Sequence, residues 1–437
     1  MKHSVAALSL VACLLTIPAC ALNAQATQAA VVQPTTAQNG ELKYGVIISR
    51  HGVRSPTAKT DQLNPFSRQP WPEWSVAPGY LTAHGFQLMQ LVGAYDRQLL
   101  TAQGLIAANN CDDAAHIRIL ADSDQRTRET GKALADGIAP GCKLVVAALP
   151  EGTPDPLFHS LDAGIGAPNK ALAIAEVAGR IGNNPAAVAE AYRPQLDALE
   201  AVLRSCAPGA ECNKENSLFD LPVLLAPGRG DHLVELRTPL GVASSLTENL
   251  LLEYAEGFAT VGWGHVDLAK LRELLQLHTA QEELGNRSPY IARAQSSNLL
   301  YHAMQSMAQA ASGKPVAGAL DKLDDRLLIL VGHDTNLANI GGALQLSWLI
   351  DGRLNDTPPG GALVFELWKK GGAYEVRTWY TAQTLDQMRN AAPLTLSSPP
   401  ERVPVFIPAC GRADGACSWQ GFQTALKAVI DPAFVRE

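Results

Sequence analysis

The sequence predicts an α/β fold, in which a mixed central sheet is flanked by helices and carries an inserted, mainly helical second domain. Two short apolar runs, 42–49 and 327–332, are rich in β-branched and aliphatic residues, and each ends in polar residues, as buried strands of an open sheet do. Between about 155 and 289 the sequence is instead rich in Ala, Leu and Glu, with apolar residues at helical spacing. We therefore expect an α/β catalytic domain at 41–154 and 290–437, interrupted by an α-helical substrate-specificity domain at 155–289.

The N-terminal region has the features of an export signal. A charged start precedes an apolar run from Val5 to Ile17, which is too short to span a membrane, and an Ala-rich stretch follows. We expect a signal peptide at 1–26 and a disordered lead-in at 27–40, so that the protein is periplasmic or secreted. The alternative is lipoprotein processing, in which an acylated Cys20 anchors the chain; without it we expect no membrane contact.

The first predicted strand ends in a group of cationic side chains. Arg50, His51 and Arg54 fall within five residues, and Gly52 lets the backbone bend and approach a ligand. The His51 imidazole can attack a phosphorus centre near neutral pH without a separate base, and guanidinium groups match phosphate oxygens two at a time. The residues alone leave open a plainer interpretation, namely a strand-end histidine and surface arginines that pair with nearby acids.

A helix over 83–106 and a strand over 116–121 come next. Asp and Ser directly after that strand are helix-capping residues, so Arg126 is predicted in the first turn of the following helix, again above a strand end. Arg128 is the competing candidate for the site, and both arginines are alternatively partners of the acids around them.

The predicted insertion contains four amphipathic helices, which we expect to cover the site and to determine which leaving groups fit. Gly and Pro residues separate them. Their expected ranges are 169–181, 185–204, 242–257 and 266–283.

The second apolar strand, 327–332, also ends in reactive side chains. His333 is placed to donate to the same phosphate, and Asp334, if protonated, can give a proton to a leaving alkoxide. Farther on, 362–368 and 374–380 are separated by a glycine-containing turn and predict an antiparallel hairpin, which makes the sheet mixed.

RHGVRSPT at 50–57 and HDTN at 333–336 resemble the signatures of the histidine acid phosphatases, most closely the bacterial periplasmic phytases and glucose-1-phosphatases. The likeness extends through WPEW at 71–74 and NDTPPGG at 355–361, and covers the chain from about Leu42 to its C-terminus. It implies two-step hydrolysis of a small phosphorylated substrate, phytate or a sugar phosphate. In this scheme Asp334 starts protonated, which predicts an acidic optimum, and we expect no metal or cofactor because fixed guanidinium charges replace a metal.

The resemblance also implies roles for individual residues. His51 would become phosphohistidine, and Asp334 would protonate the leaving oxygen and then assist water. Ala58 departs from the lysine that phytases of the family often carry after the motif threonine, which puts tuning for phytate in question. The phosphate-binding residues would be Arg50, Arg54, Arg126, His333 and Thr57, and a specificity pocket would include Glu248 and His278.

Six cysteines follow the predicted signal peptide, an even number that is typical of disulfides in an exported chain. They lack the paired C-x-x-C spacing of zinc sites. From the residues alone several pairings stay open, of which the local one is the simplest. The family resemblance implies this local pairing: Cys111 with Cys142, Cys206 with Cys212, and Cys410 with Cys417.

Three other functions compete with hydrolysis. His51, His333 and Asp334 are a possible two-histidine, one-carboxylate metal site, although the arginines beside them would repel a cation. A mutase-type phosphotransferase uses a similar histidine, but export removes it from glycolytic pools. The third is a non-catalytic binder of phosphorylated ligands.

The composition of the chain limits the kinds of molecule that we expect it to bind. With 437 residues, 47% of them apolar and 18% charged, the chain can bury a large core, and its length suggests two structural units. Its formal net charge of −7 argues against nucleic-acid binding, because that requires clustered Lys and Arg. We expect a monomer.

Overall fold

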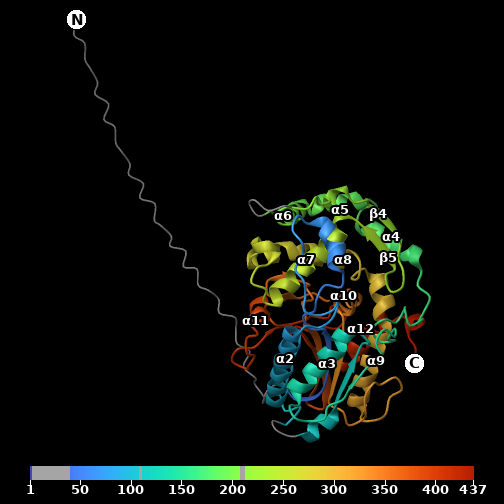
Figure 1. Cartoon of the computed structure of the whole chain (residues 1–437). Coiled ribbons are helices and arrows are strands. Elements are labelled where there is room, and N and C mark those ends of the chain that lie inside the picture. Colours follow the sequence, from blue (N-terminus) through green and yellow to red (C-terminus); the bar gives the residue numbers. More distant parts are fainter. Residues whose placement is uncertain (2–39, 108–110, 207–211) are drawn as a thin grey trace. The chain divides into compact units, whose positions relative to one another are not determined.

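The computed structural model describes Met1 and residues 40–107, 111–206 and 212–437 (Figure 1). Contacts within the chain divide it into Met1–Gln33 and Pro34–Glu437, and every helix and strand given below lies in the second unit. The predicted signal peptide after Met1, the lead-in up to residue 39 and Cys20 lie outside the described residues. Within the described ranges, no helix has the length and apolar character needed to cross a membrane.

A mixed sheet forms the centre of the fold, which confirms the predicted fold class. β1, β6, β2 and β3 are mutually parallel, whereas β9, β10 and β11 extend the sheet beyond β1 in antiparallel fashion and β12 pairs with β10. Parallel pairing places the carboxyl ends of β1, β6 and β2 at one edge of the sheet. The strand order is β11 (Glu401–Pro404), β10 (Ala373–Ala382), β9 (Ala362–Lys370), β1 (Glu41–Arg50), β6 (Leu327–Gly332), β2 (Ile117–Ala121) and β3 (Val146–Ala147), with β12 at Cys417–Ser418.

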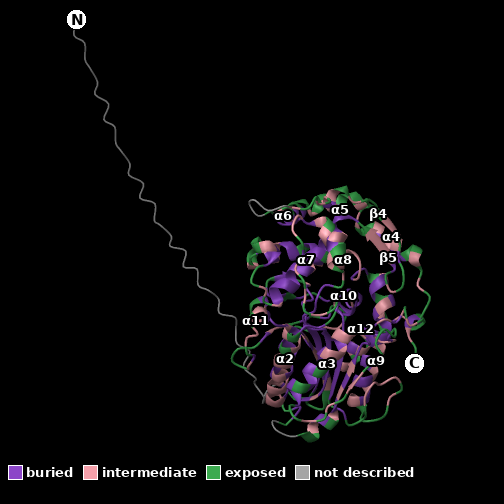
Figure 2. Ribbon diagram, viewed as in Figure 1, coloured by how far each residue is buried: buried purple, intermediate pink, exposed green. Residues whose placement is uncertain are grey.

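Helices cover both faces of this sheet because its central strands are apolar on both sides. Along β6, Ile329 packs with Leu134 of α3, whereas its neighbours Leu328 and Leu330 belong to the core on the opposite face. The central strands are correspondingly buried along their length (Figure 2). One face carries α2 (Ala83–Ala102) and α3 (Gln125–Ile138); the other carries α9 (Pro289–Ser312), α10 (Asp334–Ala343) and α12 (Trp419–Val429).

The segment that was predicted as an insertion is mainly helical, and α6, α7 and α8 share a separate apolar core. The single helix expected over 185–204 is wrong, because the structure has two helices that meet at Tyr192. Pro194 lies in the first turn of the second one, where its missing N–H is tolerated, as it would not be in the interior of a longer helix. The elements are α4 (Lys170–Arg180), α5 (Pro185–Ala191), α6 (Arg193–Leu203), α7 (Pro239–Ala255) and α8 (Leu268–Leu284), with an unpredicted hairpin of β4 (Leu224–Pro227) and β5 (Val234–Arg237).

The division into an α/β domain and an inserted helical domain stays a prediction. Short α-helices and strands lie between the elements given above. The short elements are α1 (Thr60–Leu63), α11 (Leu385–Arg389), β7 (Leu349–Ile350) and β8 (Arg353–Leu354).

Three disulfides join the six described cysteines in the local pairing that the resemblance implied. Such bonds persist in an oxidising compartment. The bonds are Cys111–Cys142, Cys206–Cys212 and Cys410–Cys417.

Candidate active site

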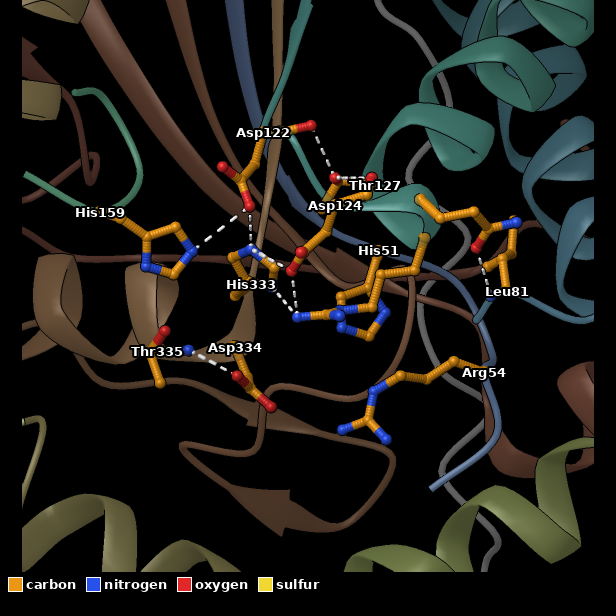
Figure 3. A network of polar contacts seen from close by, with 12 residues as sticks. His51, Arg54, Leu81, Asp122, Asp124, Thr127, His159, His333, Asp334 and Thr335 are labelled. Carbon is orange, nitrogen blue, oxygen red and sulfur yellow. Dashed lines mark hydrogen bonds and ion pairs between the residues drawn. The ribbon is translucent and has the colours of Figure 1, made fainter. Parts of the chain in front are cut away.

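The predicted motifs meet at the edge where the parallel strands end. The backbone N–H of His51 donates to Gly332 O at 3.0 Å, which joins the residue after β1 to the end of β6. The N–H of Asp122, directly after β2, donates to Val331 O at 3.0 Å. A cavity of about 250 Å³ opens at this edge. Its lining includes His51, Arg54, Arg126, His333 and Asp334, several of which Figure 3 shows.

The surroundings of His51 favour its neutral imidazole. Its Nδ1 lies 2.8 Å from Gly52 O, and since a carbonyl only accepts, Nδ1 carries the proton and Nε2 keeps its lone pair. Burial lowers the pKa of His51 well below its usual range, and the nearby charges of Arg126, Arg50 and Arg54 act in the same direction. The imidazole is therefore unprotonated even in acid.

Close packing of α2 fixes this loop. A Cβ on Gly85 of α2 would lie 2.0 Å from Val53 O, and a Cβ on Gly52 would lie 2.7 Å from Met89 Cγ. Only glycine at both positions lets the helix approach the loop this closely.

Three arginines, Arg50, Arg54 and Arg126, place their charges near His51, and each has a side-chain nitrogen without a hydrogen-bond partner among the described residues. Arg50 is fully buried and donates through Nη1 to Thr357 O at 2.6 Å. Arg54 donates through Nη1 to Ser55 O at 3.0 Å, and Arg126 pairs through Nη2 with Asp124 Oδ2 at 2.5 Å. The buried Nε atoms of all three find no hydrogen-bond partner among the described residues. Unfilled donors of this kind suit the oxygens of an anionic ligand.

Two carboxylates balance these cations. Asp334 Oδ2 lies 2.9 Å from Arg50 Nη2, and Glu248 of α7 pairs with Arg50 and, at 3.2 Å, with Arg54. Burial alone would raise the pKa of Asp334, but the charges of Arg50, His278 and Arg54 outweigh it and hold that pKa well below its usual range. The ion pair with Arg50 therefore favours the carboxylate form of Asp334, whereas the proposed role as a proton donor starts from the protonated acid.

A chain of acids and histidines, which sequence reasoning missed, supports His333. His333 Nε2 lies 2.7 Å from Asp122 Oδ2, and His159 Nε2 lies 3.3 Å from the same oxygen. Figure 3 shows both rings directed at Asp122. The other nitrogen of His159 lies 2.8 Å from Asp231 Oδ2. Asp122 directly follows a predicted strand, so the strand-end argument could have found it; no comparable signal marks His159 or Asp231.

The sequence profile of the histidine phosphatase superfamily (branch 2) matches residues 41–381. The chain belongs to this superfamily. Phytase AppA of Escherichia coli (strain K12) is 36% identical over 405 residues, which span 90% of this chain and 93% of that protein. A glucose-1-phosphatase of Providencia rettgeri is 28% identical over 88% of this chain and 91% of its own length. The Hafnia alvei phytase in complex with myo-inositol hexakis sulphate is 35% identical, with a TM-score of 0.82 over 91% of this chain and 99% of that one.

The chain is thus a histidine phosphatase. The structure also shows where the remaining predicted site residues, His278, Thr57 and Arg128, lie relative to the cavity. His278 of α8 is buried, and its Nδ1 lies 3.0 Å from Ser244 Oγ. Thr57 is exposed and is absent from the described residues that line the cavity. It lies near Arg126 across Gly79, where a Cβ would be 3.5 Å from Thr57 Cγ2 and 3.6 Å from Arg126 Nη1. Arg128 faces Glu151 at 3.9 Å instead.

The competing metal site does not match the observed grouping of ligands in this phosphatase. Among the described residues, the acid and histidine group that converges at the strand ends is Asp122, Asp124, His159 and His333, without His51 or Asp334. Arg126 already occupies one side of that group through its ion pair with Asp124. A guanidinium in this position would repel a cation.

Proposed function

We propose that this histidine phosphatase hydrolyses phosphomonoesters through a phosphohistidine formed on Nε2 of His51. The observation that carries the proposal is the position of His51, whose Nδ1–H donates to Gly52 O and leaves Nε2 with a lone pair, and which lines a cavity together with Arg54 and Arg126. Arg50, Arg54, Arg126 and His333 would bind the phosphoryl oxygens and stabilise the charge that develops on them. Thr57 would assist them at the entrance.

In the first step, His51 Nε2 attacks phosphorus in line, and the bond from phosphorus to the ester oxygen breaks. The second pKa of a phosphomonoester is about 6, so at acidic pH the substrate enters as a monoanion that brings its own proton. Phosphate bound to Arg50 weakens the field that keeps Asp334 ionised, so Asp334 takes up this proton and passes it to the leaving oxygen.

In the second step, water attacks the phosphohistidine while Asp334, again a carboxylate, accepts a proton from it. The N–P bond breaks, and inorganic phosphate leaves His51 neutral once more. Throughout, Gly52 O holds the Nδ1 proton of His51 and stabilises the positive charge of the phosphorylated ring.

We propose phytate as the substrate. Support comes from the similarity to Phytase AppA and to a phytase in complex with myo-inositol hexakis sulphate, and from the additional guanidinium group of Arg229 along the cavity. Glucose 1-phosphate is one alternative, because glucose-1-phosphatases are also similar. The other alternative is a broad-specificity acid phosphatase that accepts many small phosphomonoesters. We further propose a monomer, periplasmic or secreted through its signal peptide, that binds neither nucleic acid nor, without acylation of Cys20, a membrane.

Phosphate release from phytate, glucose 1-phosphate and p-nitrophenyl phosphate, measured between about pH 4 and 6 with a chelator present, tests the proposal. We expect turnover of all three substrates, with phytate preferred. Cleavage of the two small esters without cleavage of phytate would refute phytate as the substrate. Activity that requires an added metal ion would favour the metal-site alternative. Binding without any release would favour a non-catalytic binder.

A further inference from the structure

His159 occupies a bridging position that the mechanism above does not use. It lies in the loop that follows β3, and its side chain is 32% exposed, so one side of the ring borders the cavity. Its two nitrogens face Asp122, at the end of β2, and Asp231, in the loop between β4 and β5. The ring centroid lies 5.0 Å from that of His333. His159 therefore links the catalytic strand ends to a loop of the helical segment.

The geometry fixes the charge of this residue. Ionised carboxylates only accept hydrogen bonds, so a ring with a carboxylate oxygen at each nitrogen carries two protons and is a cation. Burial would lower the pKa of His159, but hydrogen bonds to Asp122 and Asp231 raise it to about 10. The carboxyl groups of Asp155, Asp162 and Asp124 also lie around the ring. On the other side, burial lowers the pKa of His333, and the charge of Arg126, whose Nη2 lies 3.4 Å from Nδ1 of His333, acts in the same direction against the hydrogen bond to Asp122.

His159 and His333 share one oxygen of Asp122. Both rings approach Oδ2, while the buried Oδ1 has no partner among the described residues. Burial would raise the pKa of Asp122, yet its hydrogen bonds to His159 and His333 bring it well below the usual range. The ionised carboxylate in turn lets His333 add a proton at Nδ1 when a phosphate arrives, because Nε2–H already donates to a negative charge.

We propose that His159 is a positioning residue of this phosphatase: as a cation between Asp122 and Asp231, it holds the Asp122 carboxylate ionised and directed at Nε2 of His333. The proposal rests on the proposed function because it assigns His333 to the phosphate. Without the charge of His159, Asp122 becomes protonated at a higher pH than in the wild type. His333 then loses the negatively charged acceptor that stabilises its doubly protonated, phosphate-binding form. His159 thereby extends the acidic working range of the enzyme.

Nuclear magnetic resonance of ¹⁵N-histidine-labelled full-length protein tests the charge independently of turnover. We expect the His159 ring, assigned by its loss in His159→Gln, to stay doubly protonated up to about pH 8. In Asp231→Asn one acceptor is neutral, so the same ring should titrate at lower pH. A wild-type His159 that loses its proton below pH 7 would overturn the proposal.

Steady-state kinetics and binding of inorganic phosphate test the consequence. In His159→Gln, the acid limb of kcat/KM should move up by about one pH unit, and phosphate affinity should fall below about pH 5 more than near pH 6. His159→Arg, which keeps a cation able to reach both acids, should restore the limb. His265→Gln, which alters an exposed histidine before α8, should leave it unchanged.

An equal loss of activity at every pH, with no rescue by arginine, would indicate a scaffold role and refute the proposal. If the wild type released no phosphate, the proposed function would fail, yet the pH dependence of phosphate binding in His159→Gln would still decide the role of His159.

Discussion

Asp334 Oδ2 lies 2.9 Å from Nη2 of Arg50, so the predicted proton donor of the reaction is an ion pair before substrate arrives. The Arg50 guanidinium is also bonded to Glu248 and to Thr357 O. Its charge lowers the pKa of Asp334, and only a ligand that takes over this charge can raise the pKa again. Protonation of the acid is thereby coupled to phosphate binding.

Asp334→Asn should therefore affect substrates according to their leaving groups. An alkoxide needs a proton to depart, whereas p-nitrophenolate does not, so kcat should fall by about 100-fold or more for glucose 1-phosphate and much less for p-nitrophenyl phosphate. Comparing kcat for the two substrates at one pH measures this difference. Equal losses on both would assign the proton to another group.

The pH profile follows from the same charges. His51 has a lowered pKa and stays neutral through the acid range, so its protonation does not limit the rate there. The substrate monoanion declines above about pH 6, so kcat/KM should fall from that point upward. Measuring kcat/KM for one phosphate ester across a pH series in sulphonate buffers would show where this decline begins. A maximum of kcat/KM above pH 8 would contradict the proposed mechanism.

Replacing the nucleophile separates binding from chemistry. His51→Ala should lower kcat by roughly 10⁴-fold or more, because it removes the imidazole on which the covalent intermediate forms. Inorganic phosphate should still bind, since the arginine donors remain. Rapid acid–alkali quenching should detect an N-linked phosphoenzyme in the wild type and none in the variant; wild-type turnover in His51→Ala would disprove the role of His51.

Arg126 and Arg128 offer a matched pair on α3. Arg126→Lys replaces a planar fork next to His333 by a single ammonium group, and we expect kcat/KM to fall by about 100-fold. Arg128→Lys changes a side chain that is 37% exposed and faces Glu151, so it should leave kcat/KM within about twofold of the wild type. The reverse order would exchange the roles assigned to the two arginines.

Glu253 of α7 provides a prediction about stability. Burial raises its pKa to about 7, against a small opposing effect of the hydrogen bond from the Gly262 N–H. The folded protein then keeps Glu253 neutral while the unfolded chain ionises above about pH 4.5, so its contribution to stability is lost as pH rises from there toward 7. Glu253→Gln should raise the Tm at pH 7 and change it little at pH 4. The gain in the free energy of unfolding at pH 7 should be at most about 3 kcal/mol. An equal effect at both values would exclude titration of Glu253 as the cause.

Much of the site could be predicted because local sequence determines it. The runs that became β1 and β6 are apolar, and parallel strands must end at one edge, so His51 and His333 were expected together. The placement of Arg126 followed from helix-capping residues, although Asp124 pairs with Arg126 instead of capping the helix through its side chain.

The remaining features depend on contacts between distant segments. Periodicity in the sequence determined the mixed α/β fold, and two short motifs predicted the roles of His51 and the arginines, because these features are encoded locally. The local disulfides followed from the family resemblance. Only the tertiary structure decided that Glu248 reaches Arg50, that Asp334 forms an ion pair with Arg50 and that His159 joins Asp122 to Asp231. Those relationships are electrostatic and arise between residues far apart in the chain, so no local pattern records them.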